Sequence, residues 1–109
     1  WATGKSIEWI KVHKLPDYAR FSHAVHTNNG VGCESCHGRI DQMEVVFQAE
    51  PLSMGWCLEC HRAPEQYLRP NSEVTTMGYE HPDDFVQQNL QRIEAEDIQP
   101  PTNCSACHY

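Results

Sequence analysis

The sequence predicts a small, mostly irregular domain with a few short helices and little sheet, ordered around something other than a protein core. Only 39% of its 109 residues are apolar, and seven prolines and six glycines interrupt the chain. So short a chain buries a modest share of its surface and needs disulfides, metals, cofactors or partner chains for stability. The second observation is a motif, Cys-x-x-Cys-His, which occurs three times and contains all six cysteines. Residues 1–109 are therefore expected to form one domain, organised by whatever the motifs bind.

Local patterns predict the conformation of the N-terminal segment and of the three motifs. Residues 1–20 contain a weakly alternating stretch, "SIEWIKVHKL", which precedes a proline and is predicted to be extended. Each motif, at 33–37, 57–61 and 104–108, is predicted to form about one turn of helix.

The longest helix is predicted over residues 83–96. Asp83 follows a proline, where an N-cap is expected, and acidic residues fill the first turn. The prolines at 100–101 are expected to keep it from continuing into the third motif. Its apolar positions recur at helical spacing and are expected to pack on a cofactor or a neighbouring chain. These positions are Val86, Leu90 and Ile93.

The three motifs are typical of covalent haem attachment. On one turn of helix, positions i, i+3 and i+4 share a face, so two thiols and an imidazole can address one flat group together. The thiols add to the haem vinyl groups as thioethers, and the histidine binds the iron. The predicted attachment residues are Cys33, Cys36, Cys57, Cys60, Cys104 and Cys107. The predicted proximal ligands are His37, His61 and His108.

Two other roles for the cysteines are weaker. A disulfide between cysteines two residues apart closes a very small loop and removes little entropy from the unfolded chain. Zinc would use two Cys-x-x-Cys pairs for one four-cysteine site, leaving the third pair with only histidines. Neither role explains why a histidine follows every second cysteine, so we predict three c-type haems.

Further residues are candidates for the opposite side of each iron. His23 and His26 lie three apart in "FSHAVH", just ahead of the first motif, and are predicted distal ligands. We assign His23 to the haem of the first motif and His26 to a different one. His13 is the best third candidate, while His81, in a setting predicted to be exposed, and Met54 are the alternatives.

With six-coordinate irons, no position is left for a substrate, so the predicted role is electron relay without substrate chemistry of its own. The predicted fold is a class III-like multihaem cytochrome c with a haem-centred core. The charge argues against nucleic-acid binding, because the formal net charge is −7 and no basic stripe interleaved with aromatic residues is present. Seven acids against one base in residues 71–109 suit either a basic protein partner or solubility alone.

The residues also resemble a known family. "FSHAVH", followed by "GVGCESCHGRIDQMEVVFQAEPLSMGWCLECHRAPEQYLRP", is similar to the multihaem cytochrome c subunit of bacterial alternative complex III, a membrane-bound quinol oxidoreductase. The opening "WATGKSIEWIKVHKLPDYARF" and the closing "PPTNCSACHY" are similar as well, while 71–99 is the weaker stretch. That subunit has five haems and a membrane anchor. We therefore expect this chain to correspond to its C-terminal three-haem portion or to a shortened homologue.

The resemblance implies bis-histidine haems, with distal roles for His13, His23 and His26. If one of these serves a haem of an upstream portion, His81 or Met54 replaces it here. It also implies electron entry from an iron–sulfur subunit, exit to a monohaem cytochrome, a soluble cytochrome c or a terminal oxidase, and a place on the periplasmic side of the bacterial inner membrane. The alternatives are a free periplasmic three-haem shuttle, a multihaem reductase with an open iron, and a zinc-binding module.

Overall fold

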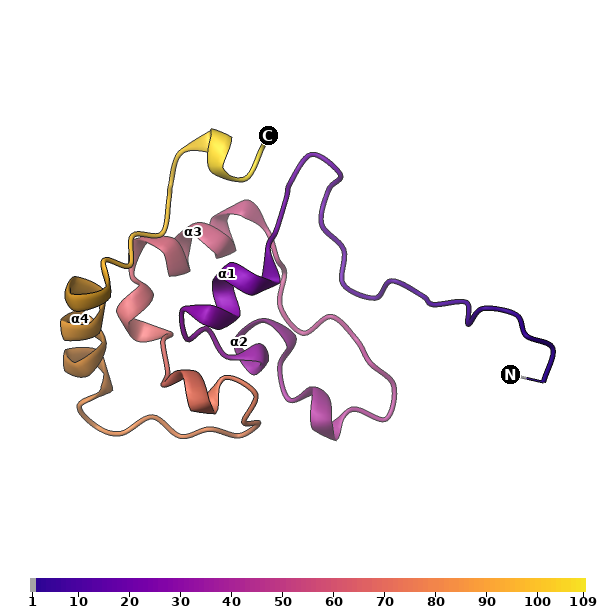
Figure 1. Ribbon diagram of the computed structural model, residues 1–109, viewed down its shortest axis with the longest axis horizontal. Coiled ribbons are helices and arrows are strands. Elements are labelled where there is room, and N and C mark those ends of the chain that lie inside the picture. The colour runs from indigo at the N-terminus through magenta and orange to yellow at the C-terminus, as the bar shows by residue number, and fades with distance from the viewer. Residues whose placement is uncertain (1) are drawn as a thin grey trace.

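The computed structural model describes residues 2–109 and consists of short helices joined by irregular segments (Figure 1). The α-helices are α1 (His23–Asn28), α2 (Cys33–His37), α3 (Met54–Arg62) and α4 (Phe85–Glu96). Four single turns of 3-10 helix accompany them: η1 (Ile40–Gln42), η2 (Pro64–Gln66), η3 (Asn71–Glu73) and η4 (Cys104–Ala106). Between residues 2 and 109 the β contacts amount to one isolated antiparallel bridge, Val31 with Leu68. The predicted fold class is confirmed.

The helices gather in one body from which the N-terminal segment extends. In Figure 1, α1, α2 and α3 lie together, α4 lies at one end, and residues 2–20 run away from the opposite side as an arm without helix or strand. The radius of gyration is 16.2 Å. A compact chain of this length has a radius of about 13 Å, so the molecule is open for its size. Among residues 2–109 no helix has the length and apolar character needed to span a membrane.

The protein core is very small. Among the described residues, Leu68 and Val74 are the buried hydrophobic side chains. Two polar side chains, Arg69 and Asn89, are buried beside them. Large apolar side chains such as Trp9, at 85% exposure, lie instead at the surface. The expectation of a thin protein core is confirmed.

Helix α4 confirms the predicted helix but corrects its start. Asp84 is the N-cap residue, one position later than the predicted Asp83, and it makes no side-chain capping bond. The helix ends at Asp97, whose φ of 52° is left-handed and whose N–H donates to the Ile93 carbonyl. A left-handed C-terminal residue breaks the helical path by itself. The helix therefore stops before the prolines at 100–101 are reached.

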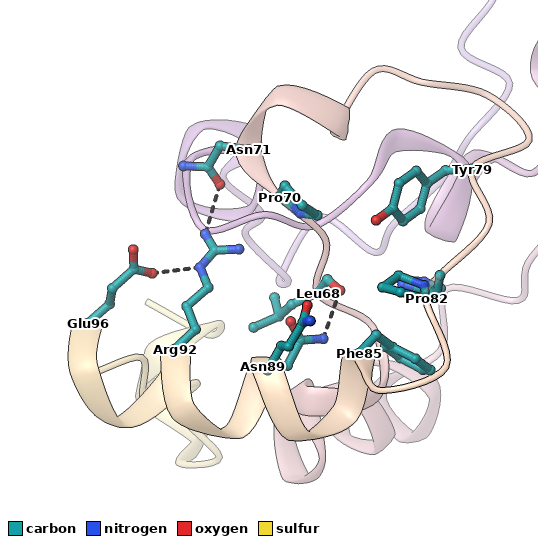
Figure 2. Close-up of a pocket in the computed structure, with 11 residues that line it drawn as sticks. Leu68, Pro70, Asn71, Tyr79, Pro82, Phe85, Asn89, Arg92 and Glu96 are labelled. Carbon is teal, nitrogen blue, oxygen red and sulfur yellow. Dashed lines mark hydrogen bonds and ion pairs between the residues drawn. The ribbon is translucent and has the colours of Figure 1, made fainter.

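The buried face of α4 differs from the predicted apolar stripe. The buried residue of α4 is Asn89, whose Nδ2 donates to the carbonyls of Glu65 and Leu68 at 2.8 Å each. Figure 2 shows the bond to Leu68. Leu90, a member of the predicted stripe, is 48% exposed. Because irregular backbone beside the helix leaves carbonyls without partners, a side-chain amide is stabilised there in place of an apolar group.

Arg69 connects the first motif to the segment before α4. Its guanidinium donates to Glu34 Oε1 at 3.0 Å and to the carbonyls of Glu73 and Thr76 at 3.2 and 2.9 Å. It also lies 4.8 Å from the centroid of the Tyr79 ring. Glu34 belongs to α2, so this buried arginine fixes the orientation of the helix that carries the first motif.

Candidate haem-binding sites

The three motifs adopt the predicted local conformation, with one difference. The first is α2 itself, and the second occupies the C-terminal part of α3. The third begins on the 3-10 turn η4. Within it, the His108 N–H donates to the Cys104 carbonyl at 3.0 Å, which is the one hydrogen bond of α-helical type. All six cysteines carry free thiols. In each motif the two thiols and the histidine are thus brought to one short turn, as the attachment chemistry requires.

Local sequence explains why two of the supporting helices begin where they do. Ser22 is the N-cap of α1 and accepts a hydrogen bond from the Val25 N–H, and Ser53 accepts from Trp56 N–H at the start of α3. Serine at this position satisfies a backbone N–H that has no partner within the helix. The N-cap of α2 is Gly32, where an added Cβ would collide with the Arg69 guanidinium. The start of the first motif is therefore fixed by close packing.

Burial and neighbouring thiols of other motifs raise the pKa values of two cysteine thiols. The pKa of Cys36 is raised to about 11, mostly by burial and in smaller part by the thiols of Cys60 and Cys57. Burial also raises the pKa of Cys57, with a contribution from Cys107 of the third motif. These thiols are therefore protonated at neutral pH.

Three of the predicted ligands are oriented in the same way, by a contact between the ring Nδ1 and a backbone carbonyl. The Nδ1 atoms of His26, His61 and His108 lie 2.7, 2.6 and 2.8 Å from the carbonyl oxygens of Ser22, Pro101 and Tyr18. A carbonyl only accepts, so each Nδ1 carries the proton. The neutral ring then has its lone pair on Nε2, which is free for a metal.

Two pairs of histidine rings have the separation that a shared iron requires. The ring centroids of His23 and His37 are 6.4 Å apart, and those of His26 and His61 are 6.2 Å apart. Two imidazoles that bind one metal from opposite sides, at about 2 Å per bond as for zinc, have centroids roughly 6 Å apart. His23 thus lies near the histidine of the first motif and His26 near that of the second, and their predicted roles as distal ligands stay predictions.

The remaining candidates lie elsewhere. His13 Nε2 is 3.2 Å from Nδ1 of His37, whose other ring nitrogen, Nε2, is the one predicted to bind iron. The ring of His108 lies beside that of Tyr18, with centroids 5.6 Å apart. Met54 is 60% exposed at the first position of α3. The structure thus places a second histidine ring near those of two motifs, and the distal ligands of all three haems stay predictions.

His81 does not have the exposed setting expected from the sequence. Its ring stacks on Phe85 with centroids 4.2 Å apart and meets the Tyr79 ring edge-on at 5.1 Å. Its Nδ1 is buried and has no hydrogen-bond partner. Burial lowers the pKa of His81, and the nearby Arg69 charge lowers it further. The ring lines a cavity of about 300 Å³ between α4 and residues 68–71, part of which is shown in Figure 2.

Burial favours the neutral form of two of the predicted ligands. Burial lowers the pKa of His37, with further lowering by His13 and His23. Burial also lowers the pKa of His26, against a smaller opposing effect of its bond to Ser22. Metal binding needs the neutral imidazole, so these rings are ready to bind without losing a proton.

The surroundings fit a haem better than a bare metal ion. Among residues 2–109 no three His, Cys, Asp or Glu side chains converge to hold a metal ion by themselves. A haem iron takes its equatorial ligands from the porphyrin, so the protein supplies only axial ones. Phe21 lies against both His23 and His26, with ring centroids 4.8 and 4.3 Å apart, and is 44% exposed. Apolar side chains beside the ligands provide contacts for a large apolar ring.

Short helical turns that carry three Cys-x-x-Cys-His motifs, with histidine rings held by backbone carbonyls, are typical of a multihaem c-type cytochrome. The chain belongs to the family of cytochrome c7 and related cytochrome c, which matches residues 19–109. No curated protein matches the chain. Proteins of this family bind c-type haems and transfer electrons, and this is the function of the present chain.

Sequence patterns do not identify all of the residues that support the site. Arg69 and Glu34 orient α2, and Gln48 fixes the arm by accepting from the Lys14 N–H at 3.2 Å. Arg69 and Gln48 lie outside the motifs, and Glu34 is one of the two variable residues within the first motif. An arginine in "YLRPN" gives no signal of burial, because charged side chains are exposed in most sequences. Only the tertiary contacts identify these residues.

Proposed function

We propose that the protein relays electrons through three covalently bound c-type haems as a subunit of a quinol-oxidising membrane complex. The observation that carries the relay is the occurrence of three Cys-x-x-Cys-His turns beside two pairs of histidine rings whose centroids are 6.4 and 6.2 Å apart. Similarity to the alternative complex III subunit, most specific over residues 5–70, supports the choice of complex.

The residues have separate tasks in this relay. When bound, a haem supplies reversible one-electron exchange at its iron. Cysteines would hold each haem covalently, and His23 with His37 and His26 with His61 would bind two of the irons. Backbone carbonyls fix the tautomer of the ligand rings, and bis-histidine coordination leaves these irons no place for a substrate.

The proposed partners follow from the resemblance. Electrons enter from an iron–sulfur subunit, and they leave to a monohaem or soluble cytochrome c or to a terminal oxidase. The protein lies on the periplasmic side of the bacterial inner membrane, beside other membrane subunits. Attachment of haem to reduced thiols outside the cytoplasm agrees with this location.

The number of haems is tested by intact mass and a pyridine haemochrome assay on protein produced with a cytochrome c maturation system. We expect three covalent haems per chain. Replacing both cysteines of one motif by serine should remove one haem and leave the other two. A colourless protein, or a mass equal to the bare chain, would overturn the proposal.

Membership of a complex is tested by tagging the protein in its native host and purifying it from detergent-solubilised membranes. We expect iron–sulfur and integral membrane subunits to copurify, with quinol-dependent reduction of the haems. Recovery of all the tagged protein in the soluble periplasmic fraction would favour the free shuttle instead. A persistent high-spin haem that binds a substrate would favour the reductase.

A further inference from the structure

The third motif receives less support from a helix of its own than the other two motifs do. His37 and His61 lie within the α-helices α2 and α3. The 3-10 turn η4 ends at Ala106, so His108 lies beyond it, and its N–H bonds to the Cys104 carbonyl at 3.0 Å. A 3-10 turn has poorer hydrogen-bond geometry than an α-helix. The placement of the His108 ring therefore depends more on contacts from distant parts of the chain.

The segment just ahead of α1 supplies such contacts on both sides of His108 (Figure 1). The Tyr18 carbonyl oxygen lies 2.8 Å from Nδ1 of His108, and the two rings have centroids 5.6 Å apart. The backbone N–H of Arg20 donates to the Cys107 carbonyl at 2.8 Å. The Arg20 side chain reaches past His108, where its Nε donates to the Tyr109 carbonyl oxygen. Its guanidinium carbon also lies 5.4 Å from the centroid of the Tyr109 ring.

Arg20 is the residue whose side chain completes this arrangement. Its backbone and its side chain donate to the carbonyls of the residues immediately before and after His108. Donation from a guanidinium is charge-assisted and stronger than donation from a neutral group, and the contact with an aromatic ring adds to it. The Tyr18 carbonyl, two residues earlier, stays within reach of the ring only while this segment keeps its place. Loss of the Arg20 side chain should therefore loosen the ring and its acceptor together.

We propose that Arg20 is a positioning residue that holds the His108 ring in the orientation required at the third haem iron. A bonded Nδ1 and a fixed ring plane are among the means by which a protein tunes a haem through its axial ligand. Arg20 provides through a tertiary contact the rigidity that the first two motifs obtain from their helices. The inference deepens the proposed function and rests on the haem proposed at Cys104 and Cys107.

The test compares Arg20→Leu with Arg20→Gln in the holoprotein, using NMR to follow exchange of the His108 Nδ1 proton with deuterium. Exchange requires the bond to the Tyr18 carbonyl to open. Leucine removes the donor to Tyr109, and we expect exchange roughly threefold to tenfold faster, as the loss of one net hydrogen bond gives. Glutamine carries a donor nitrogen at the same position along the side chain as arginine Nε, but no charge. It should restore most of the protection.

A second readout is the low-spin EPR signal of the third haem. It is identified as the signal missing from a variant in which Cys104 and Cys107 are changed to serine. We expect it to broaden in Arg20→Leu, because the ring orientation is less uniform, and to regain its width in Arg20→Gln. Lys11→Gln removes a positive charge from an exposed position on the same arm and is the control. It should leave both the exchange rate and the EPR signal unchanged.

The possible failures are distinguishable. Equal exchange rates and EPR signals in wild type and Arg20→Leu, with three haems by mass, would overturn the inference while leaving the proposed function intact. Arg20→Gln that behaves as Arg20→Leu would also overturn it, because the charge rather than the bond would then be the cause. Loss of the third haem from Arg20→Leu but not from Arg20→Gln would support it. Wild-type protein without a haem at Cys104 and Cys107 would refute both proposals.

Discussion

Arg69 is the residue on which the placement of the first motif depends most. It is 3% exposed, and Glu34 is the acidic side chain that pairs with it. A buried cation that loses its paired charge keeps its desolvation cost without compensation. The pair therefore links the protonation state of one carboxylate to the stability of α2.

Replacing Glu34 by glutamine should lower the free energy of unfolding of the holoprotein by about 2 kcal/mol at neutral pH. Burial raises the pKa of Glu34, but hydrogen bonds from Gly78, Arg69 and Tyr79 outweigh it, so the net pKa is lowered. The carboxylate therefore stabilises the fold above its ordinary pKa of 4.5, and this contribution is lost as the pH falls through the lowered value.

Urea denaturation of wild type and Glu34→Gln across this pH range checks the prediction. The difference in unfolding free energy should be largest at neutral pH and shrink on acidification. Glu94→Gln, on the exposed side of α4, should stay within about 0.5 kcal/mol of wild type. A difference that does not change with pH would show that the charge of Glu34 is not the cause.

At the scale of elements, α4 is held by a polar contact rather than by its apolar stripe. We expect Asn89→Ala to destabilise the holoprotein by about 1–3 kcal/mol, because two buried carbonyls lose their donor. Leu90→Ala should cost less, since nearly half of that side chain is already exposed. Thermal unfolding followed by the Soret band gives both values. A larger effect at Leu90 would mean that this side chain is covered in the holoprotein.

The sequence predicted those elements whose signals are local. The turns of the motifs and helix 83–96 follow from spacing, capping and periodicity, and the approach of His23 to His37 follows from their closeness in sequence. The ring of His61 contacts His26 and Pro101, which lie in distant segments of the chain. No local pattern predicts these two contacts. The burial of Asn89 instead of Leu90 depends on which carbonyls happen to lie nearby. Such contacts are decided only by the folded chain.

At the scale of the whole molecule, the haems must provide most of the interior. Leu68 and Val74 alone are buried apolar side chains among residues 2–109, which is too little to offset the loss of chain entropy. We expect a variant with all six cysteines changed to serine to lack cooperative unfolding and to be cleaved rapidly by proteases. Circular dichroism and limited proteolysis, beside the holoprotein, check this. A cooperative thermal transition in that variant would show that the polypeptide folds unaided.

The six residues of α1 carry His23 and His26 one turn apart, and each ring lies near the histidine ring of a different motif. Under the proposed function, this one short helix would supply a ligand to two irons. Any displacement of the helix moves both rings at once, so loosening one iron site would disturb the other. Inserting or deleting a residue between the two histidines would then alter both sites together.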